Sequence, residues 1–109
     1  MQFTEKGTLP VGIEIDGVIH KDFEIREQIV ADSINVFDDP ERGAKAEKNK
    51  LYANLCITAN MILSLGAIPK EEITPDLLME MHQEDLNEIS AAEMRLAIKR
   101  TSFCKEKKG

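Results

Sequence analysis

The side chains best suited to chemistry in this chain are two histidines and two cysteines. His20 and His82 stand far apart, and neither has a cysteine or carboxylate near it at metal-ligand spacing. Cys56 and Cys104 do not form a Cys-x-x-Cys pair, and no neighbouring residue marks either thiol as an activated nucleophile. These residues therefore indicate neither a metal centre nor a nucleophilic active site.

A short acidic cluster, Asp38, Asp39 and Glu41, could in principle bind a divalent cation. It lacks the Asp-x-Asp-x-Asp-Gly pattern and the closing glutamate of a calcium loop, so we interpret it as a polar turn around Pro40. The chain also has no glycine-rich phosphate loop ending in Lys-Ser/Thr and no Gly-x-Ser-x-Gly elbow. The sequence predicts a protein that is not an enzyme and carries no metal or other cofactor.

Length and charge narrow the class of partner. The 109 residues suit a single domain over 1–109, and the 42% apolar share allows a modest core. A net charge of −6 argues against nucleic acid and anionic membranes as partners. No apolar run approaches the roughly 20 residues of a membrane helix, and the N-terminus does not resemble a signal peptide. We expect a cytoplasmic protein that binds other proteins.

Residues 8–25 have the alternating pattern of a β-hairpin. A two-residue turn would place apolar side chains opposite polar ones, whereas a three-residue loop over 15–17 pairs Ile13 with Ile19. The pattern therefore predicts the three-residue loop. Pro10 cannot donate a ladder hydrogen bond, which predicts that this strand lies at a sheet edge.

The rest of the chain has helical periodicity, which predicts an α+β fold. Gly66 is placed to end a long helix, Thr74 precedes a proline as an N-cap, and Ser90 begins a capping box. The charged segment 104–109 is predicted to be a flexible tail. After the hairpin we therefore expect a bundle of about four helices, over residues 26–37, 44–65, 75–82 and 90–103.

The predicted helix over 44–65 is apolar on two sides. Ile57, Met61 and Leu65 form its second side, and methionines such as Met79 and Met94 adapt to varied partners. The alternative is that these side chains fill the core. As a functional hypothesis, these five residues bind a partner helix or a second copy of the chain.

Charge is segregated along the last third of the chain. Residues 71–93 contain eight acids and no Lys or Arg, whereas residues 94–109 contain six Lys or Arg and one acid. Two interpretations stay open: two solvated helix faces, or a polarised surface that steers a protein partner.

The order of motifs resembles one family. Asp16-Gly17-Val18 leads into Asp22-Phe23-Glu24-Ile25-Arg26, then Leu65-Gly66-Ala67-Ile68-Pro69 and Glu84-Asp85-Leu86. Over residues 8–103 the chain resembles the small tail assembly chaperones of contractile-tailed phages and prophages of the Mu-like type. The resemblance implies a protein that binds the tape measure protein before the tail tube polymerises and is absent from the mature virion. A phage-encoded chain of this kind is expected in the cytoplasm of the host cell.

The resemblance also implies that a longer form can arise by ribosomal frameshifting, for which Lys107-Lys108 is the candidate slippery site.

Two alternative functions stay open. The chain could be a structural tail or head completion component, or a small cytoplasmic adaptor of unrelated function. A structural component would remain in purified particles.

Overall fold

A three-stranded antiparallel sheet and a long C-terminal helix form the base of this α+β fold, and the predicted class is confirmed. The computed structural model describes the backbone of residues 3–108 and the side chains of residues 3–105. In chain order the elements are β1 (Thr4–Ile15), β2 (Val18–Arg26), α1 (Val30–Asp38), α2 (Gly43–Lys48), α3 (Lys50–Met61), β3 (Ile62–Leu65), the 3-10 turn η1 (Lys70–Glu72), α4 (Pro75–Met79) and α5 (Gln83–Lys108).

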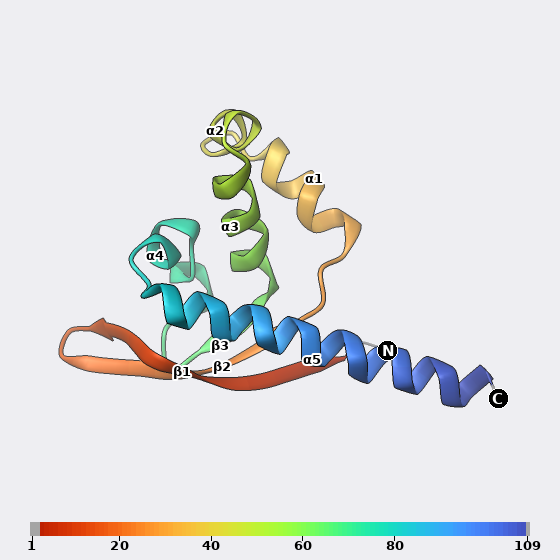
Figure 1. Cartoon of the computed structure of the whole chain (residues 1–109). Helices are drawn as coiled ribbons and strands as arrows, with labels where there is room; N and C mark the ends of the chain where they lie inside the picture. The colour runs from red at the N-terminus through yellow and green to blue at the C-terminus, as the bar shows by residue number, and fades with distance from the viewer. Residues whose placement is uncertain (1–2, 109) are drawn as a thin grey trace.

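Most elements fall into two groups, and η1 and α4 lie on the connection from β3 to α5 (Figure 1). In the first, which we call the sheet layer, α5 packs along the hairpin formed by β1 and β2, and β3 adds to β2. In the second, the helical lobe, α1, α2 and α3 pack on one another and project away from this layer. The strand order is β1-β2-β3, so β1 is an edge strand, which confirms the prediction made from Pro10.

The hairpin is confirmed, but the three-residue loop predicted over 15–17 is wrong. Ile15 pairs with Val18, which leaves a two-residue turn of Asp16 and Gly17. Both turn residues have positive φ, 52° and 81°. Such a turn matches the right-handed twist of the strands, and Asp-Gly is one of its favoured sequences.

A wide bulge in β1 explains why the parity argument failed. Thr8 pairs with Asp22 and Ile13 with His20, so four residues of β1 lie opposite one residue of β2. Gly12 in this bulge has a φ of 94°, which glycine adopts without strain. The prediction assumed an uninterrupted ladder, whereas the bulge resets the register locally.

One buried carboxylate from α5 holds the bulge. Asp85 is fully buried and accepts hydrogen bonds from the backbone N–H groups of Val11, at 2.8 Å, and Gly12, at 2.9 Å. Because a bulge removes these groups from the ladder, they need another acceptor when they are buried. Asp85 thus joins the start of α5 to the edge strand.

The single helix predicted over 44–65 is wrong. The segment is divided at Asn49, whose extended backbone ends α2. The Asn49 side chain accepts a hydrogen bond from the backbone N–H of Tyr52 and so caps α3. The last four residues, 62–65, leave the helix and pair with β2 as strand β3. Helical and strand periodicity cannot be told apart over so short an apolar run. Residues 62–65 become a strand because the free edge of β2 offers them backbone hydrogen-bond partners.

The other helices match their predictions in part. The N-cap at Thr74 is confirmed, since its hydroxyl accepts the N–H of Leu77. The helix predicted over 26–37 begins only at Val30. The helix predicted from Ser90 begins seven residues earlier, at Gln83. At this helix start, Nδ1 of His82 accepts a hydrogen bond from the backbone N–H of Glu84.

The last helix also extends beyond its predicted end. It continues from residue 103 through Lys108, so residues 104–108 of the predicted tail are helical and only Gly109 lies outside the described residues. Among residues 3–108, no helix combines the length and apolar character needed to cross a membrane.

Two apolar clusters stabilise the two groups of elements. The larger one lies between the sheet and α5, and its fully buried members include Leu9, Ile25, Ile89 and Leu96. The smaller one lies within the helical lobe and consists of Val36, Ala46, Tyr52, Ala53 and Cys56, with Ile57 packed against it. The helical lobe therefore has much less apolar volume to hold it together.

Candidate functional site

The five residues predicted to bind a partner do not share one surface. Met61 and Leu65 are buried, and Leu65 lies in β3 instead of a helix. Ile57 is half-buried against the core of the helical lobe. Met79 on α4 and Met94 on α5 are exposed but belong to separate helices. Leu65 was grouped with Ile57 because the chain was assumed to stay helical through residue 65, whereas Met61 is buried at the last position of α3 itself.

A different apolar surface lies on α1. Val30, Ile34 and Phe37 follow i, i+4, i+7 spacing, so they form one stripe along this helix, which we call the α1 stripe. Their exposed fractions are 78%, 54% and 43%. The opposite side of α1 carries Asp32 and Val36, which are buried. This helix therefore turns a carboxylate inward and three large apolar side chains outward, the reverse of an ordinary surface helix.

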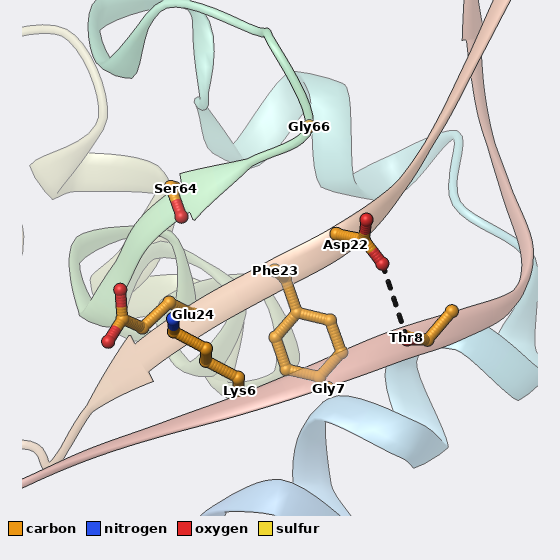
Figure 2. A pocket seen from close by; sticks show the side chains of 8 residues that line it. All are labelled: Lys6, Gly7, Thr8, Asp22, Phe23, Glu24, Ser64 and Gly66. Carbon is orange, nitrogen blue, oxygen red and sulfur yellow. Dashed lines mark hydrogen bonds between the residues drawn. The ribbon is translucent and has the colours of Figure 1, made fainter.

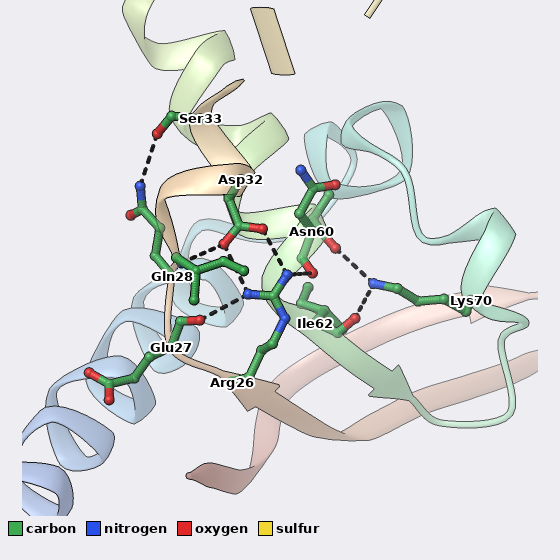
Figure 3. Close-up of polar contacts among 10 residues, drawn as sticks. Arg26, Glu27, Gln28, Asp32, Ser33, Asn60, Ile62 and Lys70 are labelled. Atoms are coloured by element: carbon green, nitrogen blue, oxygen red, sulfur yellow. Dashed lines mark hydrogen bonds and ion pairs between the residues drawn. The ribbon is translucent and has the colours of Figure 1, made fainter. Parts of the chain in front are cut away.

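The inward carboxylate is held by Arg26 (Figure 3). The two guanidinium nitrogens donate to the two oxygens of Asp32 at 2.9 and 2.7 Å, and the backbone N–H of Ile29 donates to the same carboxylate. The paired guanidinium holds the pKa of Asp32 below its usual range, and the carboxylate raises the pKa of Arg26. Breaking this pair would leave a buried charge without its counter-ion, which is strongly destabilising, so the pair fixes which side of α1 faces inward.

The same arginine joins α1 to the end of α3. It donates to the backbone carbonyl of Asn60 at 3.1 Å, while Lys70 donates to the carbonyls of Ala59 and Ile62 (Figure 3). Cations are favourable at a helix C-terminus, where carbonyls lack helical partners. Burial lowers the pKa of Lys70, as expected for an ammonium group taken from water. These contacts fix the helical lobe on the sheet layer.

A hollow of about 830 Å³ lies beside the N-terminal end of α1. The rings of Phe3 and Phe103 meet edge to face there, with centroids 5.1 Å apart. Arg100 lies at the same hollow and pairs with Glu27 at 2.9 Å, with its side chain 46% exposed. Ile29 lines the hollow and precedes the α1 stripe, so the two apolar surfaces are continuous along the chain.

The hollow on the open face of the sheet offers no catalytic arrangement (Figure 2). It is lined by exposed polar side chains, including Lys6, Thr8 and Asp22, and the Thr8 hydroxyl donates to Asp22 at 3.3 Å. The ring of Phe23 lies against Gly7 at its floor, where any larger residue would clash. The contact between Thr8 and Asp22 is exposed to solvent, and these lining residues include no histidine or cysteine.

The cysteines and the potential metal ligands do not form a site in the described part of the chain. Cys56 and Cys104 are free, and burial raises the pKa of Cys56, which keeps its thiol protonated. Among the described side chains, no group of three His, Cys, Asp or Glu residues could hold a metal ion.

Comparisons with known proteins place no further constraint on this surface. No family model matches the chain, and neither the curated proteins nor the solved structures gave a match.

The sequence predicted a helix over 26–37 but did not identify it as a binding surface. The helical spacing of Val30, Ile34 and Phe37 is visible in the sequence, yet the same spacing is typical of a core-facing helix. One usable signal was Asp32, which lies on the opposite side of this helix, six residues after Arg26. An inward ion pair reverses the usual orientation, and only the fold shows that the two side chains meet.

Proposed function

We propose that this chain is a non-enzymatic protein-binding factor, and that the α1 stripe is its docking surface. The observation that carries the proposal is the orientation of α1, whose apolar side faces solvent while Asp32 occupies the inner side. Exposed apolar side chains cost solubility unless they bind something, and i, i+4, i+7 anchors suit a partner helix.

For the partner, we propose a helix of a phage tape measure protein, with this chain as a tail assembly chaperone. The support for this step is the resemblance of residues 8–103 to that family. An exposed apolar helix face suits the work of covering apolar helices until the tail tube assembles. The net charge of −6 helps to keep a protein with such a surface in solution.

Co-expression with the tape measure protein of the same phage or prophage tests the proposal. We expect the chain to keep the tape measure protein in the soluble fraction and to co-purify with it. Ile34→Asp should abolish both effects while leaving the circular dichroism spectrum unchanged, because Ile34 is exposed. Met94→Asp is the matched control, since Met94 is 68% exposed on α5 and lies away from the α1 stripe.

Retained binding in the Ile34→Asp variant would contradict the docking surface. A tape measure protein that is equally soluble without this chain would contradict the chaperone role. Detection of the chain in purified virions by mass spectrometry would favour the alternative, a structural tail or head completion component. Binding to an unrelated cytoplasmic protein would favour a small adaptor.

A further inference from the structure

We propose that Glu93 makes the contact between α5 and the helical lobe sensitive to acid. With its carboxylate charged, Glu93 keeps water in a small hollow between the two; once the carboxylate takes up a proton, the hollow closes. This inference goes beyond the proposed function, because it concerns the response of the free protein to pH. It rests on where Glu93 lies and on which groups surround it.

The hollow lies where the helical lobe meets α5, and we call it the junction hollow. Its volume is about 200 Å³, and it is lined by Glu27, Gln28, Met61, Glu93 and Leu96. Met61 is the last residue of α3 and Leu96 belongs to α5, and both side chains are buried. The junction hollow is therefore a gap between apolar side chains of the two groups of elements, and a carboxylate lines it.

Glu93 brings its charge to this gap without a partner. The residue is half-buried. Its carboxylate accepts no hydrogen bond and joins no ion pair among the residues that the structure describes. Burial raises the pKa of Glu93, because the charged form loses part of its hydration. A charged Glu93 therefore favours water in the junction hollow, whereas a neutral carboxyl group tolerates a drier contact.

The guanidinium group on the same side of α5 is engaged elsewhere. Arg100 follows Glu93 by seven residues, about 10 Å along the helix, and it pairs with Glu27 at 2.9 Å. Arg26, which precedes Glu27 in the chain, donates to both oxygens of Asp32 (Figure 3). Neither guanidinium group pairs with Glu93.

The other cations beside α5 and the end of α3 also have partners. Arg95 and Lys99 lie on the opposite side of α5 and pair with Glu5 of β1. Lys70 donates to backbone carbonyls where α3 passes into β3. Among the described side chains at this junction, each of these cations is thus engaged, and Glu93 loses its charge by taking up a proton.

Two carboxylates near the junction respond to acid in opposite directions. The folded-state pKa of Glu93 is raised above its ordinary value of 4.5. Its neutral form therefore stabilises the fold fully below that value, and this contribution is lost as the pH rises through the folded-state value. Arg26 lowers the pKa of Asp32, so that pair stays charged while Glu93 takes up its proton. Mild acid therefore closes the junction hollow before it weakens the attachment of the lobe.

NMR of the full chain with ¹³C-labelled methyl groups tests whether the hollow closes. The Met61 signal, which is identified by its loss in Met61→Leu, reports on the hollow that Met61 lines. Between about pH 7.5 and about pH 4.5, cross-relaxation between the methyl groups of Met61 and Leu96 should strengthen. Its midpoint should match that of the Glu93 carboxyl signal. Glu93→Gln should show the strong contact at every pH.

The matched control is Glu88→Gln, because Glu88 is also half-buried on α5 but pairs with Arg95 on the opposite side. This variant should keep the pH dependence of the wild type. Cross-relaxation that stays constant while Glu93 titrates would overturn the proposal, and so would an unchanged pH dependence in Glu93→Gln.

Urea denaturation provides a second measurement. Glu93→Gln should raise the urea midpoint at about pH 7.5, because it removes a charge that opposes folding, and the increase should shrink as the pH falls towards about 4.5. A variant with an equal or lower midpoint at neutral pH would contradict the proposal. These experiments contain no partner protein, so they can fail without bearing on the chaperone role.

Discussion

In the sheet layer, Ile89 and Leu96 of α5 face the strands and are almost completely buried, whereas in the helical lobe Val30 and Ile34 of α1 face solvent. Both helices show apolar residues at helical spacing. The difference arises from what lies opposite: α5 has a sheet to cover, and α1 has its inner side occupied by the Arg26–Asp32 pair. An apolar pattern thus tells which side chains share a face, but not whether the chain itself covers that face.

The largest expected contrast comes from truncating one apolar residue in each region. Leu96→Ala should lower the free energy of unfolding by about 3 kcal/mol, because it leaves a cavity between α5 and the sheet. Ile34→Ala should change it by less than about 0.5 kcal/mol, because Ile34 is already 54% exposed. Urea denaturation followed by circular dichroism measures both. Equal losses of unfolding free energy in the two variants would show that other residues of the chain cover the α1 stripe, and the two helices would then not differ.

A second contrast concerns the two buried carboxylates, starting with the one in the sheet layer. Asp85→Asn should cost about 2 kcal/mol, because an amide supplies only one acceptor for the N–H groups of Val11 and Gly12. Glu84→Gln is the matched control, since Glu84 is exposed in the same first turn of α5. Hydrogen exchange at Gly12 reports on the bulge directly. Unchanged protection there in the Asn variant would contradict the role given to Asp85.

In the helical lobe, the corresponding change is Asp32→Asn, with an expected loss of about 2 kcal/mol at pH 7 because Arg26 stays buried without its anion. Since Arg26 lowers the folded-state pKa of Asp32, its stabilisation is complete above the unfolded-state pKa of about 4 and is lost as pH falls through the lower folded-state value. The stability gap between wild type and variant should therefore narrow below about pH 4. A gap that stays constant down to pH 2 would mean that ionisation of Asp32 does not contribute.

The smallest expected effect lies at the connection after β3. Gly66→Ala should destabilise the protein by about 1 kcal/mol, because Gly66 has a φ of 54° and an added Cβ would meet the ring of His20. Gly17→Ala is the control, since its φ is also positive, at 81°, but nothing lies near the added atom. Thermal melts of the two variants separate the backbone cost from the contact with His20. Equal shifts would show that the contact is unimportant.

Much of the fold follows from local sequence signals. The hairpin, the edge position of β1, the cap at Thr74 and the existence of α1, α3, α4 and α5 rest on turn chemistry, Pro10 and helical spacing. These signals act over a few residues, so they persist whatever the rest of the chain does. The candidate site was predicted less well, since Met61 and Leu65 are buried and the α1 stripe was not predicted as a binding surface.

By itself, the sequence determined which segments are apolar, where the chain turns, and which side chains share each helix face. Only the tertiary structure decided the bulge held by Asp85, the conversion of residues 62–65 into β3, and the outward direction of the α1 stripe. Each of the three depends on groups far apart in sequence: Asp85 with Val11, β3 with β2, and the lobe with the sheet layer through Arg26 and Asn60. Such contacts form only when the chain closes on itself, and local periodicity carries no information about them.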